Sequence, residues 1–342
     1  MIIQTKTALS LGTAAFIGVA ATTGAVAQDT PGAGTTIIMA QPTWDTGWFH
    51  TEIYVQLLEE LGYNLGNTMT LDNPIFYQSV GYGDVTMWVD GWFPLHNTYR
   101  DSFEGSAEIV GAVATGGALE GYLVDKASAD KFGIKTLDDF KRDEVKEAFD
   151  RNGDGKADLV ACPPGWGCEI NIEHHLDAYG LRDHINPIKA GYSASMADAV
   201  ASYGAGESIL FYTWTPNWTV NELVPGKDVV WIEVPRVDLP EALMGMADSA
   251  TMAGVEGCVS DPCTLGFPAS DIVPVVNTAF LNDNPAVRAL LEQASIPLTA
   301  VFAQNAAMNA GDNDIQAQAA AWIKDNRATV DGWLEAARAA AQ

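Results

Sequence analysis

The stretch CPPGWGCEINIEHHLDAYG, residues 162–180, places a tryptophan in a short loop between two cysteines and then continues as a predicted helix. Prolines and glycines surround Trp166, and Cys168 opens the helix. The N-terminus of a helix offers free backbone N–H groups to an anion. Three roles fit such a loop: a reactive thiol, a metal knuckle, or a rigid mount that pushes one indole into a pocket.

Strands alternate with helices on both sides of this loop. The predicted strands lie at the start of 35–44 and at 84–92, 207–216, 228–235 and 271–281, and the predicted helices lie at 50–62, 136–150, 284–293, 297–309, 313–326 and 329–341. This alternation is typical of an α/β fold with largely parallel sheets. The chain of 342 residues contains no internal repeat and no low-complexity linker, so we expect two compact lobes joined by crossovers.

The N-terminal residues have the pattern of a cleaved signal peptide. Lys6 is followed by a run of small and apolar residues that ends in Ala25-Val26-Ala27, so residues 1–27 are predicted to be removed. The product would be exported to the periplasm. The net charge of −26 disfavours nucleic acid as a partner.

Four cysteines in an exported protein predict two disulfides. Local pairing would join Cys162 to Cys168 and Cys258 to Cys263, one of three connectivities. The competing interpretation is a catalytic thiolate at Cys168, with histidines nearby in the same helix. A zinc site is disfavoured because no Cys/His cluster has ligand spacing.

Tryptophans are concentrated where strands end. Trp44, Trp48, Trp92, Trp166 and Trp214 lie in or beside turns and loops, where open α/β sheets bind ligands, whereas the tryptophans inside strands and amphipathic helices are expected to pack in the core. Several converging indole faces attract a methylated ammonium cation without a counter-charge. The sequence therefore predicts an aromatic cage.

Four segments resemble the periplasmic glycine betaine/proline betaine-binding proteins of ABC importers: DGWFPLHNTY (90–99), DRNGDGKADLVACPPGWGCE (150–169), FYTWTPNWTVNELVPGKDVVW (211–231) and DGWLEAA (331–337). The resemblance implies a two-lobed, type II periplasmic binding protein that closes on its ligand like a flytrap, each lobe having a mainly parallel sheet flanked by helices. Lobe I would comprise 28–120 and 233–342, and lobe II 121–232 with the cysteine loop.

The same resemblance implies the ligand contacts. Trp92, Trp166 and Trp214 match the tryptophan box of the family around a trimethylammonium group. His96 matches a histidine that binds the ligand carboxylate, and the backbone amides of Gly167 and Cys168 match its other donors.

Two departures from the family pattern change the expected ligand. Trp44 or Trp48 would close a fourth side of the box, and Glu120 stands where the family has glutamine. An acid disfavours a carboxylate ligand, but a protonated one can donate to an N-oxide. Trimethylamine N-oxide is therefore the favoured ligand, with glycine betaine, proline betaine and choline as alternatives.

The segment DRNGDGKAD has the oxygen spacing of a calcium loop. Asp150, Asn152, Asp154, the Lys156 carbonyl and Asp158 occupy ligand positions, although the final bidentate glutamate is missing. The alternative is a turn rich in Asn and Asp between a helix and a strand. We expect a structural calcium ion and no organic cofactor.

These observations together predict a periplasmic solute-binding protein without enzymatic activity. It would act as a monomer, capture a small methylated-amine osmolyte and deliver it to an inner-membrane ABC permease with its ATPase. A secreted cysteine-dependent enzyme is the remote alternative.

Overall fold

The computed structural model describes Met1 and residues 30–342. The predicted signal peptide, residues 1–27, therefore lies outside the described residues apart from Met1. Within residues 30–342, every helix is too short or too polar to cross a bilayer.

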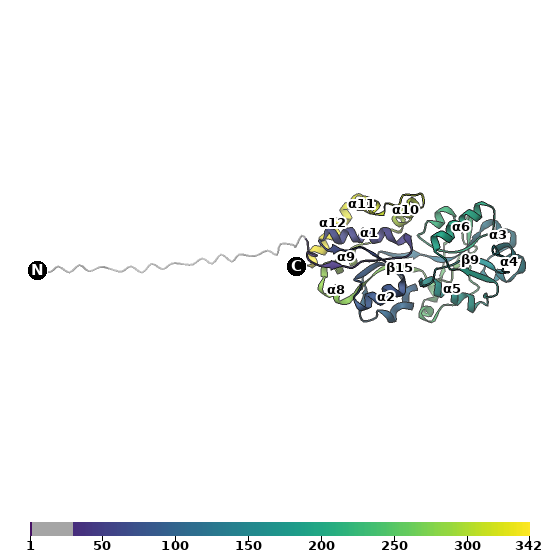
Figure 1. Ribbon diagram of the computed structural model, residues 1–342, viewed down its shortest axis with the longest axis horizontal. Coiled ribbons are helices and arrows are strands. Elements are labelled where there is room, and N and C mark those ends of the chain that lie inside the picture. The colour runs from purple at the N-terminus through teal and green to yellow at the C-terminus, as the bar shows by residue number, and fades with distance from the viewer. Residues whose placement is uncertain (2–29) are drawn as a thin grey trace.

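The described chain forms two α/β lobes that lie side by side (Figure 1). The sheet of lobe I is built on β15 (Ser270–Asn277), which pairs with β5 (Met87–Phe93), β6 (Ala107–Ile109) and β7 (Ala114–Ala118). Two short parallel pairs extend this lobe: β1 (Thr36–Ile37) with β3 (Asn64–Leu65), and β2 (Ala40–Pro42) with β4 (Met69–Leu71).

The sheet of lobe II has the strand order β10-β9-β11-β8-β12. Its strands are β8 (Glu120–Asp125), β9 (Ala157–Val160), β10 (Ile185–Ile188), β11 (Leu210–Trp214) and β12 (Val229–Ile232). Strands β10, β9 and β11 are parallel, whereas β8 runs antiparallel to both of its neighbours.

The expectation of mainly parallel sheets is therefore wrong. Every pairing of β15 in lobe I is antiparallel, and lobe II is mixed. The reason is the path of the chain between lobes. Strand β8 begins at the crossing from lobe I and runs away from the pocket, whereas β11 ends beside the pocket at Trp214, so the two strands run in opposite directions.

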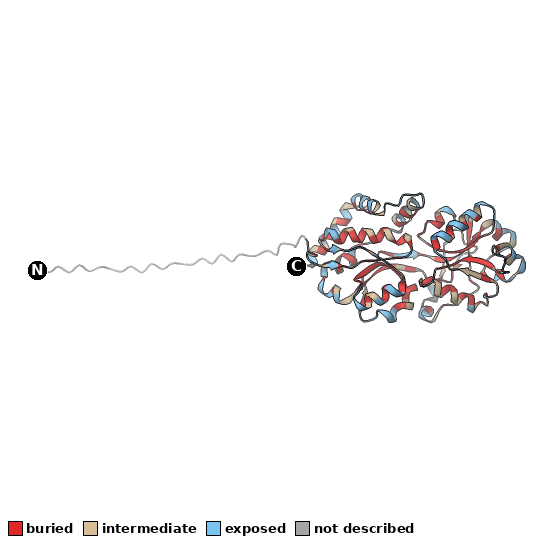
Figure 2. Cartoon of the chain, viewed as in Figure 1, coloured by how far each residue is buried: buried red, intermediate tan, exposed pale blue. Residues whose placement is uncertain are grey.

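Helices cover both sheets. In lobe I they are η1 (Asp45–Gly47), α1 (Trp48–Glu60), α2 (Asn73–Tyr82), η2 (Leu95–Ser102), α8 (Thr278–Asp283), α9 (Pro285–Gln293), α10 (Leu298–Asn309), α11 (Ile315–Asp325) and α12 (Arg327–Ala340). In lobe II they are α3 (Lys126–Phe132), η3 (Leu137–Lys141), α4 (Asp143–Phe149), α5 (Gly167–Ala178), α6 (Tyr192–Gly204) and α7 (Thr219–Glu222). Figure 2 shows buried residues along the strands and exposed ones on the outer helix faces.

The predicted helix at 136–150 is two helices instead of one. Arg142 has an extended backbone between η3 and α4. The Asp139 carboxylate accepts the backbone N–H groups of Lys135 and Thr136, at 2.9 Å each, and so caps the first helix. The break lets Phe140 and Phe149 meet in the core, with ring centroids 5.1 Å apart.

The chain crosses between the lobes twice. The first crossing lies at Leu119, between β7 and β8, next to the predicted boundary at 120/121. After β12, η4 (Glu241–Ala250), β13 (Thr251–Met252) and β14 (Cys263–Thr264) follow. The Val234 N–H donates to the Thr264 carbonyl, and the Val259 N–H to that of Trp231. Val259 thus bonds to β12 of lobe II, whereas η4 contacts η2 of lobe I. The segment between β12 and β15 therefore touches both lobes, and the predicted start of the second part of lobe I at residue 233 stays a prediction.

Candidate ligand-binding site

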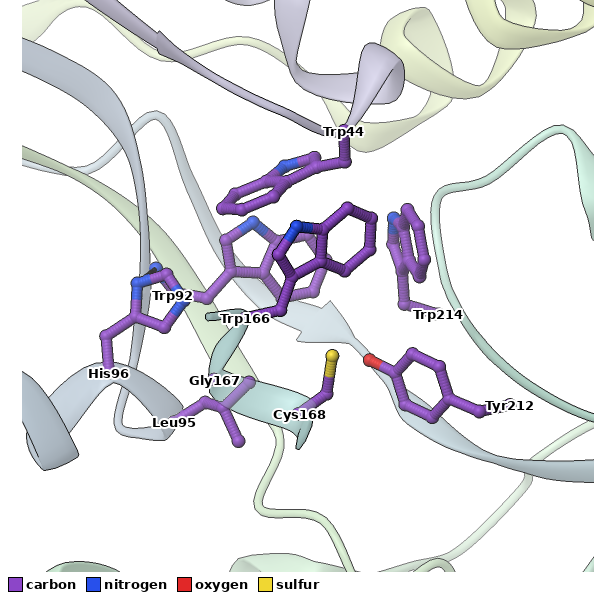
Figure 3. Close-up of a pocket in the computed structure, with 9 residues that line it drawn as sticks. All are labelled: Trp44, Trp92, Leu95, His96, Trp166, Gly167, Cys168, Tyr212 and Trp214. Carbon is purple, nitrogen blue, oxygen red and sulfur yellow. Dashed lines mark hydrogen bonds between the residues drawn. The ribbon is translucent and has the colours of Figure 1, made fainter. Parts of the chain in front are cut away.

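A pocket lies between the lobes, and seven of the predicted residues line it (Figure 3). Its walls are Trp44, Trp92, Leu95, His96, Trp166, Gly167, Cys168, Tyr212 and Trp214. The pocket encloses about 280 Å³, including its mouth. Ligand pockets for drug-sized molecules span roughly 300–1,000 Å³, so this one suits a compact molecule.

Four indoles surround this space, and we call them the tryptophan cage: Trp44, Trp92, Trp166 and Trp214. The Trp166 ring is central. Its centroid lies 5.2 Å from that of Trp44 and 5.6 Å from that of Trp214, at interplanar angles of 73° and 75°. These edge-to-face contacts leave ring faces turned toward a common volume.

The two indoles from lobe II are held by hydroxyls of lobe I. The Trp166 Nε1–H donates to Thr43 Oγ1 at 2.8 Å, and the Trp214 Nε1–H donates to Thr46 Oγ1 at 3.2 Å. Because each bond crosses between lobes, this arrangement of rings requires the lobes to be close together. The cage and the closed conformation therefore form together.

The two indoles from lobe I share one buried carboxylate. Asp90 is completely buried in β5, and it accepts the Trp44 Nε1–H at 2.7 Å and the Trp92 Nε1–H at 3.0 Å. His50 Nε2 of α1 lies 3.1 Å from the same carboxylate. The carboxylate fits against Gly47, where a Cβ atom would lie 1.9 Å from Asp90 Oδ2. Glycine at 47 thus makes room for the group that fixes both rings.

His96 is buried and hydrogen-bonded on both ring nitrogens. The Trp92 backbone N–H donates to Nδ1 at 3.1 Å, Tyr77 Oη lies 2.7 Å from Nδ1, and the Asn73 amide lies 2.9 Å from Nε2. Burial lowers the pKa of His96 to about 3, so its imidazole is neutral at pH 7. It lines the pocket without contributing a positive charge.

The N-terminus of α5 reaches the pocket through the cysteine loop. Trp166 is the residue before the helix, and no side chain caps the first amides, at Gly167 and Cys168. The Cys162–Cys168 disulfide closes the loop, and Cys258–Cys263 forms the second predicted pair. The local pairing is confirmed. With all four cysteines bonded, the thiolate required by the competing enzyme interpretation does not exist.

Glu120 lies behind the pocket wall and not in it. It is buried in β8, and its Oε1 accepts a short hydrogen bond from the hydroxyl of Tyr212, which does line the pocket. In Figure 3 this hydroxyl points toward the space beside Cys168. Burial raises the pKa of Glu120 to about 8, so the group is mostly protonated at pH 7.

This raised pKa predicts a specific pH dependence of stability. Between the ordinary pKa near 4.5 and about 8, the folded protein holds a proton that the unfolded chain releases, so stability falls as pH rises through this window. The contribution is about 1.4 kcal/mol per pH unit. We expect the Glu120→Gln variant to lose this component, so that its melting temperature rises relative to wild type between pH 5 and pH 8. If the melting temperatures of the two proteins changed with pH in the same way across that range, Glu120 would not be the group responsible.

Trp48 does not join the cage. Its Nε1–H donates to the Pro42 carbonyl at 2.8 Å, and the ring lines a separate crevice with Asp45 and Ser193. The sequence reasoning missed Leu95 and Tyr212. Tyr212 was detectable, because it precedes Trp214 by two positions in β11 and alternation puts both side chains on one face.

The calcium-like loop bonds to its own backbone. Asp150 accepts the N–H groups of Gly153 and Gly155 at 2.7 and 2.8 Å, and Asp158 accepts those of Arg151 and Asn152. Within residues 30–342, no cluster of three or more His, Cys, Asp or Glu side chains is arranged to hold a metal ion. The calcium site stays a prediction.

Comparison with known proteins places this geometry in a family. Residues 35–325 match the model described as the substrate-binding domain of ABC-type glycine betaine transport systems. The chain belongs to this family. It is therefore the substrate-binding protein of an ABC transporter and not an enzyme.

Individual relatives agree with this membership. The chain is 38% identical to the glycine betaine-binding periplasmic protein OusX of Dickeya dadantii, over 98% of this chain and 99% of that protein. It is 23% identical to the trimethylamine N-oxide-binding protein of Pelagibacter ubique, over 85% and 88% of the two chains. The crystal structure of a glycine betaine/L-proline-binding protein from Borrelia burgdorferi superposes with a TM-score of 0.70 at 16% identity, covering 90% of this chain and all of that one. The chain thus has the predicted two-lobed α/β fold, with mixed sheets in place of mainly parallel ones.

Proposed function

We propose that this substrate-binding protein captures trimethylamine N-oxide in the periplasm and delivers it, as a monomer, to an inner-membrane permease with its ATPase. The observation that carries the proposal is the fourth indole. Trp44 faces Trp166 and completes a ring of aromatic faces around a small space. Each good cation–π contact contributes roughly 0.5–2 kcal/mol, and a compact trimethylated nitrogen can meet several faces at once.

The polar side of the pocket suits a ligand that has a single hydrogen-bond-accepting oxygen. Tyr212 presents a hydroxyl there, and the protonated Glu120 behind it can donate to the Tyr212 oxygen. Tyr212 would then turn its own proton toward the N-oxide. His96 is neutral, and both of its nitrogens have protein partners, so the pocket lacks a cationic side chain for a carboxylate.

Glycine betaine is the second candidate, and specific observations favour it. The relative at 38% identity is named for this ligand. The uncapped amides of Gly167 and Cys168 at the start of α5 also suit a carboxylate, because a helix N-terminus carries a partial positive charge. Choline, which lacks an anionic oxygen, would use the cage but not these amides.

Tryptophan-fluorescence titration decides between the candidates. The purified protein is titrated with trimethylamine N-oxide, glycine betaine, choline and dimethylsulfoniopropionate. We expect the N-oxide to bind about tenfold or more tightly than glycine betaine, because glycine betaine must bury a carboxylate without a cationic side chain as its partner, whereas the N-oxide has no carboxylate. Equal or tighter binding of glycine betaine would overturn the ligand assignment and leave the transporter class intact.

The Glu120→Gln variant tests the role of the acid in the same titration. A glutamine can still bond to Tyr212, but it offers the Tyr212 oxygen a weaker amide N–H donor in place of the carboxyl O–H. The preference for the N-oxide over glycine betaine is therefore expected to shrink. An unchanged preference would remove Glu120 from the account of selectivity.

A further inference from the structure

Asp90 is completely buried directly behind the tryptophan cage. Its side chain does not line the pocket, yet each of its oxygens accepts an indole N–H from a ring that does. Glu120, the other buried acid near the pocket, bonds to Tyr212 on lobe II. Asp90 is thus the buried acid that is hydrogen-bonded to the two lobe I indoles of the cage, Trp44 and Trp92.

A buried carboxylate in this position acts on the ligand through two physical effects. Its negative potential is weakly screened, because protein and not water surrounds it, and the potential extends through the rings into the pocket. Its hydrogen bonds also draw electron density onto the two indoles, which strengthens the attraction of their faces for a cation. His50 Nε2, 3.1 Å away, is the titratable group that faces Asp90 from α1.

The opposite wall of the pocket has the opposite polarity. There the N-terminus of α5 presents the amides of Gly167 and Cys168 and the positive end of the helix dipole. The pocket therefore has an electrostatic axis, from Asp90 behind Trp44 and Trp92 in lobe I to the start of α5 in lobe II. A dipolar ligand aligned with this axis would have its methylated nitrogen toward lobe I.

We propose that Asp90 is a specificity-determining residue, which sets how strongly the cage prefers positive charge and which way a dipolar ligand faces. The inference rests on the proposed capture of a methylated amine. An electrostatic role for Asp90 can be distinguished from a purely structural one. The effect of its charge on affinity depends on the charge of the ligand, whereas a loosened cage would weaken the binding of every ligand alike.

The test compares a net cation with a zwitterion. Affinities of tetramethylammonium, trimethylamine N-oxide and glycine betaine are measured by calorimetry for wild type and for the Asp90→Asn variant. Tetramethylammonium is expected to lose about tenfold or more in affinity. For the two zwitterions, the fold-decrease in affinity should be smaller than that of tetramethylammonium by about threefold or more. Removing the negative charge weakens the attraction of their nitrogens, but it also relieves the repulsion of their negative oxygens. Equal losses for all three ligands overturn the proposal, as does failure of tetramethylammonium to bind wild type at millimolar concentration.

Two further variants keep the test decisive. Asp101→Asn removes a charge from the exposed surface of lobe I and should leave all three affinities unchanged. Trp44→Phe retains the Asp90 charge but removes one N–H donor, so affinities fall while the ratio of cation to zwitterion affinity stays within about threefold. A collapse of that ratio in Trp44→Phe contradicts the proposal even if Asp90→Asn fails to fold. If wild type binds none of the three ligands, the proposed function itself fails.

Discussion

Replacing Trp166 by alanine is expected to abolish ligand binding while the fold remains intact. Trp166 is the ring that contacts both Trp44 and Trp214, and its N–H bonds to Thr43 across the lobes. The variant loses a cage wall and a bond that closes the lobes. Central aromatic residues in binding sites contribute about 2 kcal/mol or more, so we expect affinity to fall by roughly thirtyfold or more. Calorimetric titration with the best-binding methylated amine measures the loss.

The matched control is Trp322→Ala. Trp322 is half-buried on α11 and stacks on Trp333, with ring centroids 6.3 Å apart. It contributes aromatic surface to lobe I but no wall to the pocket, so its loss should leave affinity unchanged. Retained binding by Trp166→Ala, with a normal melting curve, would falsify the cage as the ligand site.

The second large effect is expected for Gly47→Ala. The backbone of Gly47 has φ −90° and ψ −10°, which alanine adopts freely, so the substitution acts by steric overlap alone. The new methyl group would lie 1.9 Å from Asp90 Oδ2 and 2.8 Å from Pro42 Cγ. The carboxylate must move and release at least one indole. Overpacking of this kind costs about 1–3 kcal/mol, so we expect a melting temperature several degrees lower and about tenfold weaker binding.

Gly66→Ala is the corresponding control. Gly66 is exposed, and no atom lies within 4 Å of the position that a Cβ would take. Melting temperature and affinity should match wild type within error. If Gly47→Ala behaved like this control, the packing of the carboxylate against residue 47 would be unimportant for the site.

Most of the cage was predictable because its residues follow local patterns. Trp92, Trp166 and Trp214 lie near strand ends or in a Pro/Gly loop, and the local pairing was one of three connectivities that the four cysteines allowed. Local chemistry also predicted the last four helices to within two residues at each end. These features depend on neighbours in sequence, which the sequence displays directly.

The parts that could not be predicted depend on contacts across the chain. Asp90 gives no signal in sequence, because its importance comes from indoles at Trp44 and Trp92 that converge on it from different segments. Glu120 was expected to meet the ligand, but antiparallel pairing of β8 with β11 puts Tyr212 between it and the pocket. Trp44 and Trp48 were equivalent candidates until the turn through η1 directed only Trp44 into the cage.

The sequence by itself thus predicted the α/β class from its pattern of strands and helices, the two-lobed fold from its resemblance to a family, and the aromatic character of the site from residue type and spacing. Only the tertiary structure decided the strand directions and the protonation of the buried acid beside the pocket. The physical reason is that the burial of a carboxylate, and therefore its protonation and its influence on a ligand, is set by distant segments that pack against it.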